Sequence, residues 1–179
     1  MLEGVRIGLL SDSHGFLDPA IFRYFAECDE IWHAGDFGKV AQFDELNAFK
    51  PTRGVWGNID GADVRRAMPR DLYWECAGLF VYMTHIGGYP GVYDKRARVA
   101  IDQRKPGLFI CGHSHIYSFH EMDGIHVVNQ PAVGYPLDEG AIIGWLDTTF
   151  SRDGADIKFR TIDSANPRNG AITSLRWRT

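Results

Sequence analysis

Two short stretches of the sequence place aspartate and histidine at spacings that could bind a metal ion. Asp12 and His14 lie in Asp-Ser-His, and His113 and His115 lie in His-Ser-His. Each stretch follows an apolar run that is typical of a buried strand. Because residues i and i+2 of an extended segment point to the same side, we expect the two side chains of each pair to reach one centre.

Three more strand-like segments end on polar residues of the same kind. They supply Asp36 and Asn58, each directly after a glycine, and His85 after a threonine. Almost no Lys or Arg accompanies these segment ends, so a salt-bridge network does not explain the carboxylates, whereas bound cations would supply the missing charge. The candidate metal ligands are Asp12, His14, Asp36, Asn58, His85, His113 and His115.

The mixture of carboxylate, amide and imidazole side chains indicates which metals to expect. Such ligands suit manganese, iron or zinc better than magnesium, which prefers oxygen ligands and keeps several waters. One ion would need only three or four protein ligands. Two ions, about 3.5–4 Å apart, would share a bridging carboxylate and use the whole set. We therefore predict two divalent metal ions as cofactors, manganese first, with iron, zinc or nickel as alternatives.

The first half of the chain alternates between strand-like and helix-like segments. Asp18 followed by Pro19 is a typical helix start. The strand-like runs cover residues 5–10, 30–37 and 52–60, and the helix-like runs cover residues 19–28 and 39–49. This alternation predicts a parallel α/β sheet, in which ligands bind outside the carboxyl ends of the strands.

The second half of the chain contains more of the turn sequences that join antiparallel strands. Ala77-Gly78 and Asp123-Gly124 each separate two β-rich runs, which predicts two hairpins. A helix is expected at residues 92–105, and further strands are expected at residues 107–115, 141–150 and 155–163. The sequence contains no linker that would separate domains, so we expect one domain over residues 1–179, with residues 165–179 forming a mobile tail or a small edge element.

Composition and charge exclude several classes of protein. The net charge of -4 gives no basic footprint for nucleic acid, and no apolar stretch is long enough to cross a membrane. The beginning of the chain lacks the features of a signal peptide. The three cysteines are scattered, which is typical of reduced thiols inside the cell. We therefore expect a cytoplasmic protein without membrane insertion.

The ordered series Asp-Ser-His, Gly-Asp, Gly-Asn, Thr-His and Gly-His-Ser-His resembles the calcineurin-like metallophosphoesterase superfamily. It is most similar to the small, single-domain, bacterial and archaeal phosphodiesterase-type branch. The stretch at residues 127–138 resembles the Asn-Pro-Gly-Ser-Val-Gly segment of that superfamily. The resemblance implies a four-layer α/β/β/α sandwich with two packed mixed sheets and a metal site at the carboxyl ends of the strands.

The same resemblance implies how the ligands divide between the metals and what they catalyse. Asp36 would bridge the two ions, and a hydroxide between them would attack a phosphate ester in line, a diester more readily than a monoester. Asp36, Asn58 and His85 would take direct part in catalysis. One ion would be held by Asp12, His14, Asp36 and His115, and the other by Asp36, Asn58, His85 and His113.

Two departures from the superfamily pattern affect substrate and mechanism. Ile59 stands where many members have the histidine that is thought to protonate the leaving group, so the general acid is open. The phosphodiesterase-type branch commonly lacks that histidine as well. Gln130 is inserted in the loop after residue 129, and Ala132 stands where the family usually has glycine.

Other residues are candidates for supporting roles. Asp60 and Asp138 would either orient a ligand imidazole or cap a turn, and Tyr89 and Tyr135, with Phe37 and Tyr93, would line a substrate pocket or belong to the core. Gly15, Gly35 and Gly57 would let the backbone pass close to the metals. Ser13, His33, His120 and His126 are expected to be structural.

The functional alternatives are a phosphomonoesterase and a non-catalytic scaffold of the same fold. The retromer subunit of the superfamily is regarded as such a scaffold and has lost part of the ligand set, whereas every ligand position is kept here. A single-zinc peptidase would need an HExxH helix, which this sequence lacks. The expected partner is a small phosphate ester, and a homo-oligomer is possible.

Overall fold

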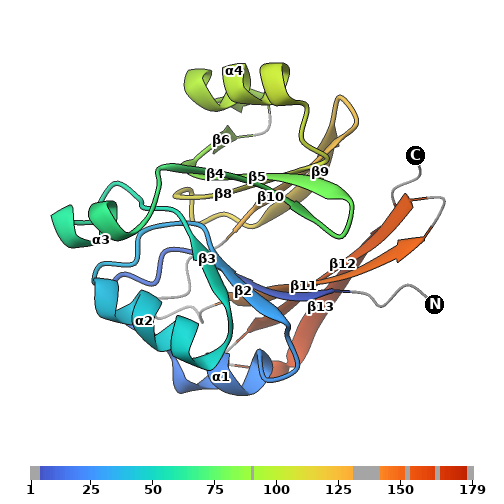
Figure 1. Ribbon diagram of the computed structural model, residues 1–179. Helices are drawn as coiled ribbons and strands as arrows, with labels where there is room; N and C mark the ends of the chain where they lie inside the picture. The colour runs from blue at the N-terminus through green and yellow to red at the C-terminus, as the bar shows by residue number, and fades with distance from the viewer. Residues whose placement is uncertain (1–4, 90, 131–141, 152–153, 164–165, 177–179) are drawn as a thin grey trace.

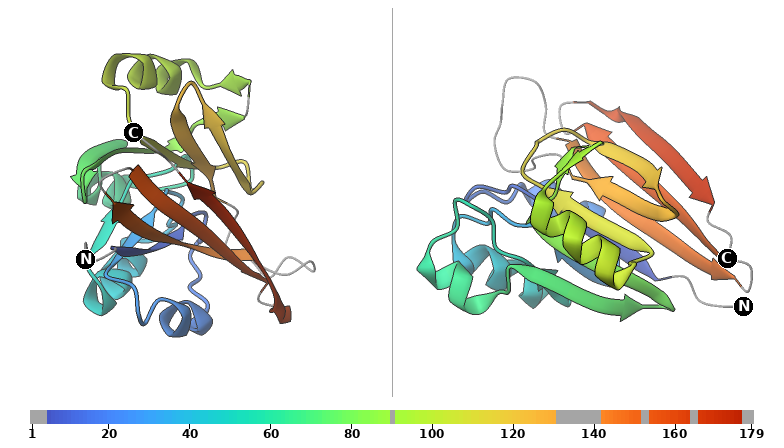
Figure 2. Two further views of the ribbon diagram at one scale, coloured as in Figure 1. Left: turned by 90° about the vertical axis from the view of Figure 1, so that its right-hand side faces the viewer. Right: turned by 90° about the horizontal axis from the view of Figure 1, so that it is seen from above.

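A computed structural model describes residues 5–89, 91–130, 142–151, 154–163 and 166–176. Two β-sheets pack face to face, and helices cover the outer face of each, which gives the four layers visible in Figure 1. The two further views in Figure 2 agree with this layering. The mixed α/β sandwich implied by the family resemblance is therefore confirmed.

The first sheet has six strands in the order β13-β12-β11-β1-β2-β3. Its strands β1, β2 and β3 are parallel to one another, and β11 pairs with β1 in the antiparallel direction. The bounds are β1 Arg6–Leu10, β2 Glu30–His33, β3 Thr52–Gly54, β11 Ile142–Ser151, β12 Gly154–Asp163 and β13 Asn166–Arg176. Asp12, Asp36 and Asn58 lie on the loops that follow these three parallel strands.

The second sheet has five strands in the order β4-β5-β8-β10-β9. Both hairpins predicted from the sequence are present, because β4 pairs with β5 and β9 pairs with β10 in the antiparallel direction. Strand β8 lies parallel to β5 and to β10. The bounds are β4 Asp71–Cys76, β5 Leu79–Ile86, β8 Leu108–Gly112, β9 Ser118–Met122 and β10 Ile125–Asn129.

The helices form the two outer layers. On the first sheet, the described part of the chain has α1 Pro19–Tyr24, α2 Val40–Phe49 and α3 Ala62–Ala67, and on the second it has α4 Lys95–Arg104. Helix α1 begins as predicted, since the carboxylate of Asp18 accepts a hydrogen bond from the Ala20 N–H. Asp94 caps α4 in the same way, through the N–H groups of Arg96 and Ala97.

The core between the sheets is built by alternation along the strands. Ile7 and Leu9 of β1 pack against Val81, Met83 and Ile110 of the second sheet. Leu10 belongs to a second buried cluster with residues of α1 and α2. Both faces of the central strands are therefore buried, which fixes the loops at their carboxyl ends.

The sequence prediction missed three short elements and gave two alternatives for the last segment. Helix α3 and the small hairpin of β6 (Gly88–Tyr89) and β7 (Val92–Tyr93) were not expected. Within that segment, the described residues Asn166–Arg176 form β13, at the edge of the first sheet. The single-domain organisation over residues 1–179 stays a prediction.

Candidate metal centre

The candidate ligands lie on loops that leave the two sheets at adjoining edges. Asp12 and His14 follow β1, Asp36 follows β2, Asn58 follows β3, His85 is near the end of β5, and His113 and His115 follow β8. The loops after β1 and β2 are joined by main-chain hydrogen bonds from Asp12 N to Gly35 O and from His14 N to Asp36 O, at 2.9 and 3.0 Å. The site therefore lies where the two sheets meet.

Five of the ligands adopt the left-handed backbone conformation, with φ between 47 and 70°. Such a conformation costs a non-glycine residue roughly 1 kcal/mol or more and clusters at functional sites. It also corrects the argument from extended segments. His113 and His115 join different groups of ligands, whereas Asp12 and His14, at the same spacing, join one group. The five residues are Asp12, His14, Asp36, His113 and His115.

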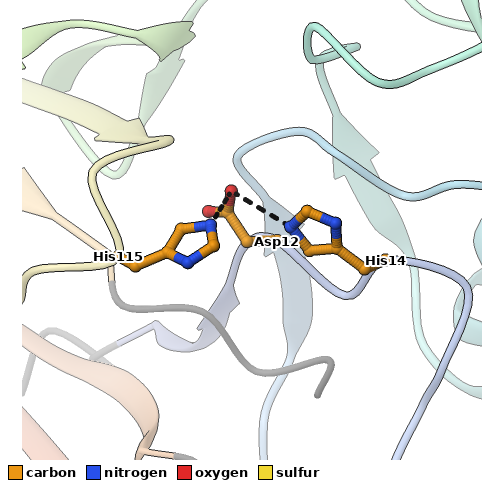
Figure 3. Close-up of side chains that lie close together, drawn as sticks. All are labelled: Asp12, His14 and His115. Carbon is orange, nitrogen blue, oxygen red and sulfur yellow. Dashed lines mark ion pairs between the residues drawn. The ribbon is translucent and has the colours of Figure 1, made fainter. Parts of the chain in front are cut away.

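The first group joins residues from both sheets around Asp12. Its Oδ1 atom lies 3.2 Å from His115 Nε2 and 3.8 Å from His14 Nε2, as the dashed lines in Figure 3 mark. The ligand atoms of the three residues all lie within 4.8 Å of one another. This is the set that the resemblance implied for one metal, apart from the bridging residue.

The second group consists of Asp36, His85 and His113. The Oδ2 atom of Asp36 lies 3.2 Å from His85 Nε2, and it also lies 4.0 Å from His14 Nε2 of the first group. Asp36 thus presents one oxygen to imidazoles of both groups. A bridging carboxylate between two metals needs this position.

Hydrogen bonds fix one oxygen of each carboxylate and leave the other for the centre. Asp12 Oδ2 accepts from Ser11 Oγ and from His113 N, and Asp36 Oδ1 accepts from Ile59 N at 3.1 Å. Asp12 Oδ1 is buried and has no hydrogen-bond partner among the described residues, and the same holds for His14 Nε2. Buried polar atoms without partners are costly, so a cation between them fits the site.

The tautomer of His85 strengthens this fit. Its Nδ1 donates to the carbonyl of Ala34 at 2.8 Å, which leaves Nε2 facing the carboxylate of Asp36 and the amide oxygen of Asn58 at 3.0 Å. A neutral imidazole would direct its lone pair at these acceptors, so either a proton or a metal ion must lie there.

The pKa values of this pair follow the same arrangement. Burial lowers the pKa of His85, but the hydrogen bond and the charge of Asp36, with the charge of Asp12, raise it more, and the pKa ends above its ordinary value. Burial raises the pKa of Asp36, yet the contacts with His85 and the Ile59 N–H bring it below its ordinary value. Carboxylate oxygens beside imidazole nitrogens are a donor set for divalent cations.

The glycines in these loops are required for contact between ligands. A Cβ on Gly57 would lie 2.0 Å from Asp36 Oδ1, and a Cβ on Gly35 would lie 2.7 Å from the His85 ring. The expected close approach of Gly35 and Gly57 is therefore to the ligand side chains. For Gly15 a Cβ would meet no atom within 4 Å, but its φ of +87° is one that favours glycine. Its closeness to a metal stays a prediction.

Asp60 caps two turns and does not orient an imidazole. Its two carboxylate oxygens accept from Gly38 N at 2.7 Å and from Gly57 N at 2.8 Å. Since Gly57 precedes Asn58, the buried Asp60 carboxylate holds the loop that presents the amide ligand. Asp138, the other residue with these two alternatives, lies outside the described residues.

His33 and Ser13 have the structural role expected of them, in a buried network that includes Gln42. His33 Nδ1 accepts from Gly35 N, so Nε2 carries the hydrogen and donates to Ser13 Oγ at 2.9 Å. Ser13 in turn lies 3.0 Å from Gln42 Oε1. Burial lowers the pKa of His33 to about 3, so the ring is neutral. Sequence reasoning missed Gln42 and Ser11, which show no motif.

Of the aromatic residues considered for a substrate pocket, some line a cavity and one belongs to the core. Tyr89 and Tyr93 line a cavity of about 410 Å³ together with His113, next to the metal centre. Phe37 is fully buried and stacks on His33, so its assignment to a pocket is wrong and the core alternative holds. Tyr135 lies outside the described residues, as does Ala132. The side chain of Ile59 is 47% exposed beside the centre and carries no proton to donate.

Sequence reasoning also missed three arginines that line a second cavity, which is bordered by His85. Arg65, Arg70 and Arg96 line a cavity of about 170 Å³ together with Asn58 and His85. No spacing rule could have found them, because α3, the segment after it and α4 each supply one.

Comparison with known proteins identifies similar chains. Residues 5–149 match the model of the calcineurin-like phosphoesterase superfamily domain. A probable metallophosphoesterase of Methanothermobacter thermautotrophicus is 26% identical over 166 residues, which cover 84% of this chain and 94% of that protein. A probable metallophosphoesterase of Mycoplasma pneumoniae is 30% identical over 138 residues, which cover 73% of this chain and 80% of that protein.

Solved structures show the same fold at low sequence identity. Vps29 of Chaetomium thermophilum superposes with a TM-score of 0.76 at 13% identity, covering 98% of this chain and 95% of that one. A predicted phosphoesterase of Streptococcus pneumoniae gives a TM-score of 0.71 at 18% identity, covering 98% and 99%. Vps29 of Entamoeba histolytica complexed with zinc gives a TM-score of 0.71 at 14% identity, covering 97% of this chain and 100% of that one.

The described helices also bear on the membrane. None of them is long and apolar enough to cross a bilayer.

Proposed function

This chain belongs to the calcineurin-like phosphoesterase superfamily, and from that membership we propose that it hydrolyses phosphate esters with two divalent metal ions. The observation that carries the proposal is the position of Asp36. Its Oδ2 atom lies 3.2 Å from His85 Nε2 and 4.0 Å from His14 Nε2, so one carboxylate oxygen faces ligands of both groups. Two ions that share this oxygen would account for both sets of imidazoles.

We propose that the seven ligands divide as the two groups suggest. Asp12, His14 and His115 hold one ion, His85, His113 and Asn58 hold the other, and Asp36 contacts both. Bound there, the two ions supply an activated water and the positive charge that phosphoryl transfer requires. Manganese fits the mixed nitrogen and oxygen donors, and iron, zinc and nickel remain alternatives.

The chain's own residues orient the reacting groups. The Ala34 carbonyl holds His85 in one tautomer, and the Ile59 N–H and Ser11 hydroxyl each hold one carboxylate. The exposed amide of Asn58 is placed to contact the phosphate as well as an ion. Since Ile59 carries no proton, we propose that the leaving group receives its proton from water.

Two cavities beside the centre support a diester as substrate. One contains Asn58 and His85 in its wall, and the other contains His113. A diester has two substituents on phosphorus, and each cavity could receive one of them. We propose small phosphodiesters on this basis. The homo-oligomer and the cytoplasmic location stay predictions.

The second candidate function is that of a non-catalytic interaction protein, as the structural likeness to Vps29 suggests. Retention of every ligand position favours the enzyme. The test is hydrolysis of bis(p-nitrophenyl) phosphate and p-nitrophenyl phosphate by chelator-treated protein to which manganese, zinc or magnesium is returned. Asp36→Asn removes the bridging charge, and Asp44→Asn makes the same change on the exposed face of α2.

We expect manganese to restore turnover of the diester above that of the monoester in the wild type and in Asp44→Asn, and not in Asp36→Asn. A faster monoester reaction would favour the phosphomonoesterase. If both ions bind and neither ester is hydrolysed with any metal, the protein is an interaction module and the proposal is wrong.

A further inference from the structure

A small cavity beside the metal centre has a strongly positive wall. Its volume is about 170 Å³, and Asn58 and His85 of the candidate centre form part of the wall. Arg65, Arg70 and Arg96 form another part, and none of its lining residues in the described part of the chain is acidic. The chain as a whole has a net charge of -4, so this local excess of positive charge runs against the overall balance.

Arg96 is the arginine whose charge is compensated. It forms an ion pair with Asp71 and donates to Thr84 Oγ1 at 3.0 Å. Asp71 also accepts from the hydroxyl of Tyr82. Asp71, which does not line the cavity, therefore fixes Arg96 and offsets its charge.

Arg65 is held by groups that leave its charge in place. Its Nε donates to the Asp60 carbonyl at 2.7 Å and its Nη2 to the Asn58 carbonyl at 3.2 Å. Carbonyl oxygens orient a guanidinium but carry no formal charge. The guanidinium also lies over the Trp56 ring, 4.5 Å from the centroid.

Arg70 lies over the same indole at 5.4 Å, and its side chain has no hydrogen bond or ion pair with the described residues. Two uncompensated guanidinium groups thus lie on one tryptophan. Both guanidinium groups are exposed and line the same cavity, so an anion in that cavity can meet the charge of each. The planar N–H fork of arginine matches the oxygens of a carboxylate or a phosphate.

We propose that this cavity, the arginine pocket, binds a second anionic group of the substrate. The inference rests on the proposed function and narrows its substrate class to phosphodiesters in which one alcohol carries a further carboxylate or phosphate. The phosphate ester lies at the metals, and the second anion reaches past Asn58 and His85 to Arg65 and Arg70. Arg70 is the specificity residue, because its side chain, unlike that of Arg65, has no hydrogen-bond partner among the described residues.

The experiment measures binding without turnover. The zinc-loaded full chain is titrated in a calorimeter with alkylphosphonates, whose carbon–phosphorus bond is not hydrolysed. Ethyl-, propyl- and butylphosphonate are compared with analogues of the same tether length that end in a carboxylate or a second phosphonate. Arg70→Gln removes the free charge, and Arg66→Gln makes the same change on the exposed neighbour in α3, outside the pocket.

We expect a terminal anion to tighten binding about tenfold at one tether length or more in the wild type and in Arg66→Gln. The gain disappears in Arg70→Gln, while the affinity for the plain alkylphosphonates stays within about twofold. If a terminal carboxylate and a terminal phosphonate increase the affinity by different factors, the larger increase identifies the anion that the pocket prefers.

The experiment distinguishes a failure of the proposed function from a failure of the arginine pocket. If the wild type binds no alkylphosphonate at all, the proposed function fails. If the alkylphosphonates bind and a terminal anion adds nothing, or adds as much in Arg70→Gln as in the wild type, the metal centre stands and the arginine pocket is refuted.

Discussion

The Oδ2 atom of Asp36 lies 3.2 Å from the Nε2 atom of His85, across the junction of the two sheets. Asp36 follows a parallel strand of the first sheet, and His85 belongs to a strand of the second. The contact is held from both sides, by the Ile59 N–H on Asp36 and by the Ala34 carbonyl on His85. Changes that move either residue should therefore act on metal binding before they act on the fold.

Gly57→Ala tests how closely the amide loop must approach the bridging carboxylate. The added Cβ would lie 2.0 Å from Asp36 Oδ1 and 2.5 Å from Asp36 N, so the carboxylate has to shift. We expect a loss of about 1–3 kcal/mol in the free energy of unfolding and weaker manganese binding, measured by urea denaturation and by titration calorimetry. Gly61→Ala is the control, since its Cβ would meet only the flexible end of Asp63. Unchanged manganese affinity in Gly57→Ala would contradict this geometry.

Asp60→Ala tests the turn that holds Asn58. The substitution leaves the N–H groups of Gly38 and Gly57 without their acceptor, so we expect to lose about 2–3 kcal/mol of stability and about tenfold or more in metal affinity. Asp18→Ala removes a similar cap from α1, and should cost about 1 kcal/mol without changing metal affinity. Equal metal affinity in the two variants would show that the Asp60 turn has no part in the centre.

His33 predicts how stability depends on pH. Burial lowers its pKa to about 3 in the folded protein, against an ordinary value of 6.5. Between these two values the unfolded chain binds a proton that the folded chain does not, so stability is lost as the pH falls through this window. The advantage of the wild type over His33→Gln should shrink by up to about 1.4 kcal/mol for each pH unit below 6.5. Urea denaturation in the presence of a chelator at pH 7.5, 6 and 5 measures the difference in the free energy of unfolding between the two proteins. If this difference grows as the pH falls, the interpretation of His33 as a buried, neutral ring is refuted.

The strands and the ligand types could be predicted from the sequence because local signals determine them. Buried apolar runs gave β1, β2 and β8, and turn residues at Ala77-Gly78 and Asp123-Gly124 gave both hairpins. The ligands stood out because polar residues at the ends of buried strands need a reason. Their division between two groups came from the family resemblance, and spacing alone gave it wrongly for His113 and His115.

What the sequence could not reveal depends on contacts between distant segments. The left-handed backbone at Asp12, Asp36 and His113 could not be predicted from residue type alone, although Asp and His adopt it more readily than most residues. The roles of Ser11, Gln42 and the three arginines appear only once α3, α4 and the strand ends are packed together. Short elements such as α3 and the hairpin of β6 and β7 carry too few residues for a periodic signal.

The most direct test of the central claim is a crystal structure of the manganese-loaded protein with anomalous scattering recorded at the manganese edge. We expect two peaks about 3.5–4 Å apart, both in contact with Asp36 Oδ2, one beside His14 and His115 and the other beside His85 and His113. A single peak, or two peaks of which only one contacts Asp36, would contradict a centre bridged by this carboxylate.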